Sequence, residues 1–189
     1  MIKSKFKGQA SYPNGLTMCT TACVCACLTS LCNRNTCDLM EDIMNVSSLL
    51  HGKLQRRVGH TLMSVRDVVE CEELQQFTEK ICLSEKSMVS KDFIGIGHDN
   101  KGEENEDDFF IHPQKIIDKI DRDFAVVLTC MDHSTCMFYN EKFGGLCYFD
   151  PGPATVISEM TPSESLSVLK DLSHFTQCDV NFIRLTLKT

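Results

Sequence analysis

Cys19 stands at a place in the chain where a thiol is readily converted to a thiolate. It comes four residues after Gly15, in the turn sequence Pro13-Asn14-Gly15, and opens a helix that the spacing of small side chains predicts from about Thr17 to Leu31. The partial positive charge at a helix N-terminus lowers the pKa of a thiol and favours the nucleophilic thiolate. Three more cysteines lie deeper in this helix, where the advantage fades and burial is expected: Cys23, Cys25 and Cys27.

His133 and Asp150 are candidates for the base and for the group that orients it. His133 lies between the predicted strands 124–131 and 135–139, and Asp150 closes the predicted strand 146–149. In such a hairpin the two residues lie on adjacent strands near one end, so the carboxylate can accept a hydrogen bond from the imidazole. The plain alternatives are a strand-end histidine without a role and an aspartate that forms the turn before Pro151.

A thiol, an imidazole and a carboxylate together carry out acyl transfer. The thiolate attacks a carbonyl carbon, the imidazole acts as base and then as acid, and the carboxylate holds the imidazole in one tautomer. The order Cys19, His133, Asp150 therefore predicts a cysteine peptidase, which needs neither a metal nor a cofactor.

Helices dominate the first part of the chain. Besides the helix at 17–31, the apolar spacing predicts one over 38–50, and Ser64 followed by Asp67 predicts an N-terminal cap within a helical segment at 61–82. Residues 8–16 are expected to form a loop. Pro113 is typical of a helix start and predicts a short helix through Ile120.

Strands dominate the second part. Short apolar runs predict buried strands at 124–131, 135–139 and 146–149, with a loop at Gly144-Gly145. Thr161-Pro162-Ser163 opens a further helix, and the segment 180–187 alternates so that Ile183, Leu185 and Leu187 would be buried on one face. Helices followed by a mostly antiparallel sheet predict an α+β fold, in one domain over residues 1–189.

Composition limits the function classes. The chain has 189 residues, a net charge of −7, no tryptophan and no run of Lys and Arg, which argues against nucleic acid as a partner. The start of the chain lacks an apolar signal segment, and 19–32 is too short to span a bilayer. We therefore expect no membrane partner and an intracellular location, cytoplasmic or nuclear, where the 12 cysteines stay reduced and most are buried.

Two features leave alternatives open. The acidic stretch 99–108 is either a solvated loop or a docking surface for a basic partner segment. The cysteine cluster at 23, 25 and 27, or Cys130 with His133, could instead form a zinc or redox module. However, cysteines two residues apart on a helix point to different sides, and the sequence lacks a repeated C-x-x-C pair.

Several short motifs resemble papain-fold deubiquitinases. They are the string Asn14-Gly-Leu-Thr-Met-Cys19-Thr-Thr-Ala22, the histidine before a strand, and Tyr148-Phe149-Asp150-Pro151. The resemblance spans nearly the whole chain and is closest to the herpesvirus tegument type and its relatives. It implies a papain-like fold, with the nucleophile on a central helix, and hydrolysis of conjugates of ubiquitin or a ubiquitin-like protein. It leaves open whether the chain is part of a larger protein.

The resemblance also suggests which residue donates to the oxyanion, and it reveals one difference between this chain and the herpesvirus enzymes. In the herpesvirus enzymes a glutamine upstream of the cysteine helps to form the oxyanion hole; Gln9 matches it here, with Asn14 as the competing candidate. The herpesvirus histidine stands two residues after the aspartate, where this chain has Gly152. If the chain is active, its imidazole comes from elsewhere, and the more general papain-like order places it at His133. The departure also motivates two alternatives, a catalytically inactive domain that binds ubiquitin or another protein, and a different papain-like activity such as a transglutaminase-like or amidase reaction.

Overall fold

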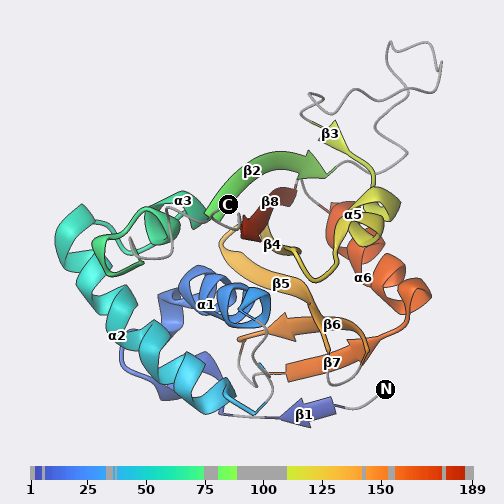
Figure 1. The fold of residues 1–189 in the computed structure, drawn as a ribbon. Coiled ribbons are helices and arrows are strands. Elements are labelled where there is room, and N and C mark those ends of the chain that lie inside the picture. The colour runs from blue at the N-terminus through green and yellow to red at the C-terminus, as the bar shows by residue number, and fades with distance from the viewer. Residues whose placement is uncertain are drawn as a thin grey trace.

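A computed structural model describes residues 3–5, 7–32, 36, 38–74, 81–88, 110–141, 144–152, 156–175 and 178–185. The acidic stretch 99–108 lies outside these residues. Helices come first and a large sheet follows (Figure 1), so the predicted α+β class is confirmed. The described residues contain no helix that is long and apolar enough to cross a membrane.

The nucleophile candidate opens the central helix α1, Cys19–Leu31. Almost every side chain of α1 is buried, because it packs on strands of the sheet on one side and on helices α2 and α3 on the other (Figure 1). Its threonine, alanine and cysteine side chains are small, which lets both layers approach closely. The predicted central helix is confirmed, beginning two residues later than expected.

Helices α2 and α3 cover the outer side of α1. α2 runs from Met40 to Val58, farther than predicted, because Leu54 continues the buried face and Gly59 ends the helix at φ +77°. α3, Val65–Val69, begins with the predicted capping box, in which Ser64 and Asp67 bond reciprocally. Residues 8–16, expected as a loop, hold a 3-10 turn at Gln9–Ser11 and the start of another at Gly15–Thr17.

The described strands form one eight-stranded sheet in the order β1-β7-β6-β5-β4-β8-β2-β3. Every neighbouring pair is antiparallel except β2–β3. The strands are β1 Lys3–Lys5, β2 Ile81–Met88, β3 Phe110–Ile111, β4 Phe124–Cys130, β5 His133–Asn140, β6 Gly145–Asp150, β7 Val156–Met160 and β8 Cys178–Leu185.

Helices cover both faces of the sheet. Ala125 and Val127 of β4 belong to the core shared with α1, whereas Val126 and Leu128 belong to a second core. The second core is closed by two helices that lie side by side, α5 (Pro113–Lys119) and α6 (Pro162–Phe175) (Figure 1). A strand buried on both faces has a continuous apolar run, which explains the pattern at 124–131.

Several sequence predictions for this region are confirmed, and one is wrong in part. Helices α5 and α6 and strands β4, β5 and β6 match the predicted segments. The helical segment expected through Cys82 is wrong at its end, because Ile81–Met88 is strand β2, which pairs with β8. In the last strand Ile183 is buried as predicted, Phe182 is also buried on the opposite face, and Leu187 lies outside the described residues. The single domain over 1–189 stays a prediction.

Candidate active site

Cys19 is the first residue of α1. The residue before it, Met18, makes no side-chain capping bond within the described part of the chain, so the thiol itself occupies the helix N-terminus. The residue is 3% exposed. Its Sγ lies 3.6 Å from the carbonyl oxygen of Asp132, in the turn between β4 and β5. The thiol therefore faces the end of the sheet at which β5 begins.

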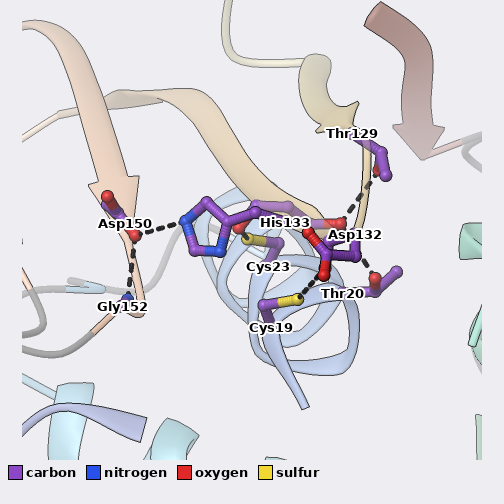
Figure 2. Close-up of polar contacts among 9 residues, drawn as sticks. Cys19, Thr20, Cys23, Thr129, Asp132, His133, Asp150 and Gly152 are labelled. Carbon is purple, nitrogen blue, oxygen red and sulfur yellow. Dashed lines mark hydrogen bonds and ion pairs between the residues drawn. The ribbon is translucent and has the colours of Figure 1, made fainter. Parts of the chain in front are cut away.

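His133 and Asp150 form a hydrogen-bonded pair next to this thiol. His133 is the first residue of β5 and Asp150 the last of β6, and His133 Nε2 lies 2.9 Å from Asp150 Oδ1. The ring lies between Asp150 and Cys19 (Figure 2), and the thiol and the imidazole shift each other's pKa. The structure thus brings together the three residues that the sequence singled out.

The three groups shift one another's pKa values. Hydrogen bonds to Asp150 and to Cys19, which outweigh burial, raise the pKa of His133 to about 10. Burial alone would raise the pKa of the Cys19 thiol, but the hydrogen bond with His133 and backbone N–H groups outweigh it, so this pKa is lowered. Burial likewise opposes ionisation of Asp150, yet its bonds to His133 and Gly152 lower its pKa. These directions favour a thiolate beside an imidazolium.

Gly152 takes part in the site through its backbone. Its N–H donates to Asp150 Oδ1 at 2.8 Å, the same oxygen that His133 contacts. A Cβ at this position would lie 3.0 Å from that oxygen, closer than most Cβ contacts, so glycine suits the turn. The β5–β6 ladder ends at the Cys136–Phe149 pair, and both His133 and Gly152 lie beyond it, at the same end of the hairpin. The imidazole of His133 and the position where the herpesvirus resemblance expects one therefore adjoin the same carboxylate, Asp150.

Gln9 is held between the two halves of the site. Its backbone N–H donates to the carbonyls of Pro151 and Gly152, at 3.0 and 3.2 Å. Its carbonyl packs so closely on Gly15 that a Cβ there would overlap it. The side-chain Oε1 is buried without a hydrogen-bond partner among the described residues. Its role as oxyanion donor stays a prediction.

The competing candidate, Asn14, is placed differently. It is exposed, adopts the left-handed conformation at φ +61°, and directs its amide toward Gly52 of α2. The contacts to the Asp150 turn therefore favour Gln9 over Asn14 as the amide next to the reacting groups.

A chain of hydroxyl groups that the sequence did not reveal joins α1 to the sheet. Thr20 Oγ1 lies 2.8 Å from Ser134 Oγ, which in turn lies 2.9 Å from Thr129 Oγ1. Thr20 and Ser134 directly follow Cys19 and His133 in the chain, and Figure 2 shows these bonds beside the thiol. The link holds the nucleophile and base candidates against each other. No single-sequence signal identifies it, since threonine and serine are common in both elements.

The remaining cysteines of α1 contact three different parts of the core. Cys23 donates to the carbonyl of Ser134 and Cys27 to that of Val126, whereas Cys25 interacts with Ser47 of α2. Burial raises the pKa of both Cys23 and Cys25 to about 11, so they stay protonated. They point to different sides, as predicted, and no cluster of three potential metal ligands occurs among the described residues.

Comparison with known proteins bears on the fold. No family model and no curated protein matches the chain. Among solved structures, it is similar to the ubiquitin-specific protease encoded by the murine cytomegalovirus tegument protein M48, crystallised with a ubiquitin-based suicide substrate. The TM-score is 0.65 at 10% sequence identity, and the match covers 100% of this chain and 88% of the other. The chain therefore has the α+β, papain-like fold of a viral tegument ubiquitin-specific protease, as its sequence predicted.

Proposed function

We propose that this protein is a cysteine peptidase in which Cys19 is the nucleophile, His133 the acid–base group and Asp150 the residue that orients His133. The observation that carries the proposal is the arrangement of three side chains at the N-terminus of a buried 13-residue helix: the His133 imidazole is hydrogen-bonded to Asp150 and lies between that carboxylate and the Cys19 thiol (Figure 2). Three such groups occur in one place with the pKa directions that nucleophilic catalysis requires.

The first half of the reaction forms an acyl-enzyme. The Cys19 thiolate attacks the substrate carbonyl carbon, and the electron pair moves to the carbonyl oxygen, which the backbone N–H of Cys19 and the Gln9 amide stabilise. Each such donor is worth about 10²–10³ in rate. The His133 imidazolium then protonates the departing amine as the C–N bond breaks. Asp150, bonded to Nε2, leaves Nδ1 to face the thiol and the leaving group.

The second half restores the thiol. The now neutral His133 removes a proton from a water molecule, whose oxygen attacks the thioester carbon. The C–S bond breaks, the carboxylic acid product leaves, and the thiolate and imidazolium form again.

The proposed substrates are conjugates of ubiquitin or a ubiquitin-like protein. The support is the fold shared with the M48 protease, which was crystallised with a ubiquitin-based suicide substrate, over the whole of this chain. A net charge of −7 suits a partner with a basic C-terminal tail. A thiol nucleophile fits a reducing compartment, which agrees with the cytoplasmic or nuclear location expected from the sequence.

A ubiquitin probe with a C-terminal electrophile tests the proposal. We expect wild type to form one adduct, mapped by mass spectrometry to Cys19, and Cys19→Ala to form none. Cys23→Ala, which removes the next thiol of the same helix, is the matched control and is expected to react.

Other outcomes would overturn the proposal in distinguishable ways. An adduct that persists in Cys19→Ala would place the nucleophile elsewhere. Ubiquitin binding by calorimetry without any adduct would favour the inactive binding domain. If iodoacetamide alkylates Cys19 rapidly at neutral pH but the ubiquitin probe does not, the thiol is activated and ubiquitin is the wrong substrate.

A further inference from the structure

A second histidine, His51, lies behind the start of the nucleophile helix. It belongs to α2 and is fully buried, with 0% exposure. Its Nε2 lies 2.9 Å from Thr17 Oγ1, and its Nδ1 lies 3.0 Å from Thr21 Oγ1. The two threonines stand two residues before and two residues after Cys19, so one imidazole contacts the chain on both sides of the nucleophile.

The hydrogen-bond donors around His51 define its protonation. Gln55, one turn along α2, donates to Thr17 Oγ1 at 3.2 Å, so Thr17 has its own proton left to donate. That proton has two acceptors, His51 Nε2 at 2.9 Å and the Asn14 carbonyl at 3.4 Å, and the shorter contact is to the ring. His51 then accepts at Nε2 and donates from Nδ1 to Thr21. Burial lowers the pKa of His51, against a smaller opposing effect of the Thr61 backbone, which agrees with a neutral ring.

The first turn of α1 depends on such contacts. Met18 provides no side-chain cap within the described residues, so the helix start lacks the usual local anchor. On the sheet side, Thr20 bonds to Ser134; on the α2 side, Thr17 and Thr21 bond to His51. Cys19 lies between these two attachments. The direction in which its Sγ points is therefore set by both.

We infer that His51 is a positioning residue for the nucleophile: through Thr17 and Thr21 it holds the start of α1 where the Cys19 thiol meets His133. The inference rests on the proposed function for its catalytic consequence. His51 contacts no reacting group itself. A displacement of about 1 Å in a nucleophile can lower the rate about 10²-fold, so the loss of this anchor has a measurable effect on chemistry.

The test compares two substitutions of His51 with a matched core variant. His51→Leu keeps the position apolar and buried but removes both hydrogen bonds, whereas His51→Gln keeps one donor and one acceptor. Leu54→Ala is the control, since Leu54 is also fully buried on α2 and belongs to the apolar core, and its truncation destabilises without touching the threonines. Thermal unfolding identifies a temperature at which all variants are folded, and the kinetics are measured there.

Two readouts separate positioning from stability. The first is hydrolysis of ubiquitin carrying a C-terminal fluorogenic amide: we expect His51→Leu to lower kcat by about 10- to 10²-fold with little change in KM. The second is the pH dependence of Cys19 alkylation by iodoacetamide, which needs no protein substrate: we expect its midpoint to rise in His51→Leu, because the thiol loses its contact with His133. His51→Gln is expected to restore most of both properties, and Leu54→Ala to leave both unchanged.

Each alternative result has a defined meaning. If His51→Leu keeps the wild-type kcat and alkylation profile, or if Leu54→Ala reproduces its defects, His51 serves stability alone and the inference fails. If wild type does not hydrolyse the ubiquitin substrate, the proposed function fails; the alkylation profiles then still decide whether His51 positions the thiol.

Discussion

At the scale of single residues, the properties of the site come from immediate neighbours rather than from residue types. Cys19 and Cys23 are both buried thiols of α1, yet the pKa of Cys19 is lowered and that of Cys23 is raised to about 11. The two thiols are one helical turn apart. Burial raises the pKa of both thiols, but at Cys19 the effect is outweighed by His133 and by backbone N–H groups, whereas at Cys23 burial dominates.

The first prediction concerns the reactivity of Cys19 as a function of pH. Alkylation by iodoacetamide follows the thiolate, so its rate in wild type should rise through a midpoint below the ordinary thiol value of 9.0. In His133→Ala burial is no longer opposed by the imidazole, and the midpoint should move upward. Stopped-time alkylation read by mass spectrometry gives both curves. Coincident curves would show that His133 does not activate the thiol.

At high pH, the pH dependence of substrate hydrolysis should differ from that of Cys19 alkylation. Protonation of the leaving amine requires the His133 imidazolium, which loses its proton as the pH rises through about 10. Hydrolysis should therefore fall on the alkaline side while alkylation stays on its plateau. Measured kcat/KM that remains level well above pH 10 would contradict the role of His133 as the acid.

The second prediction concerns stability. The folded pKa of His133 is raised, so its contribution is complete below the unfolded value of 6.5 and is lost as the pH rises through about 10. The folded pKa of Asp150 is lowered, so its contribution is present above its ordinary value of 3.8 and is lost as the pH falls through the folded value. The urea midpoints of wild type and His133→Ala should thus differ most near pH 6 and converge toward pH 10. A difference that grows with pH would contradict this sign.

The residues that carry the proposed chemistry were predictable, whereas those that support them were not. Cys19, His133 and Asp150 follow from side-chain chemistry and chain order, because few residue types can act as nucleophile, base and orienting group. His51 and Thr20 could not be identified, since a buried histidine or threonine matters only through its partners on another helix or strand. The Gln9 contact to the Asp150 turn is likewise a tertiary feature.

At the scale of elements, the β5–β6 hairpin determines which residue can present the imidazole. Positions 133 and 152 both lie beyond the Cys136–Phe149 pair at the same end of the hairpin, and both adjoin Asp150, since His133 Nε2 and the Gly152 N–H contact the same Oδ1. An imidazole that lies between Asp150 and Cys19 could therefore be carried at either of two positions of the hairpin, 133 or 152. In this chain the β5 side carries the imidazole, on His133.

The third prediction moves the imidazole across the hairpin. His133→Ala should abolish labelling by the ubiquitin probe. Adding Gly152→His should restore part of it, because the new imidazole would start from the other side of the hairpin, next to Asp150. Recovery should be partial, since a Cβ at 152 crowds Asp150 Oδ1 at 3.0 Å. Tyr139→His, at the far end of β5, is the control that should restore nothing. Equal labelling of the single and double variants would show that position 152 does not face the site.

The sequence predicted the helices and strands whose own residues have a clear apolar pattern. It missed the strands that form because a distant strand pairs with them. Helix α1, helix α6 and strand β4 have clear apolar patterns. Strand β2 reads Ile-Cys-Leu-Ser-Glu-Lys-Ser-Met, whose exposed Ser84 and Glu85 resemble a helix surface, and it is a strand because β8 pairs with it along eight residues. The three-residue strand β1 likewise exists through its pairing with β7.

At the scale of the whole molecule, strand β8 joins β2 and β3 to the other five described strands of the sheet. It lies between β4 and β2, with Ile183 in the core next to α1 and Phe182 in the core next to α5 and α6. The sequence predicted a strand here but not its central place, because strand order depends on contacts between distant segments. Burial on both faces is what a central position imposes.

The fourth prediction uses this central position. Phe182 is 1% exposed, and Lys119 of α5 lies 4.8 Å from its ring centroid. Phe182→Ala should lower the free energy of unfolding by about 3–5 kcal/mol, measured by urea denaturation. Asp179→Ala, an exposed position of the same strand, should change it by about 0.5 kcal/mol or less. Similar effects of the two substitutions would contradict a central β8.

The place of β8 also has a consequence for how the protein is made. All three residues of the proposed triad have been synthesised once Asp150 is added, but β4 then lacks its partner on one side until residues 178–185 leave the ribosome. The strand edge next to β4 therefore stays unpaired until the last described strand has been made. The sheet that carries His133 gains its full set of neighbours only when that strand joins it.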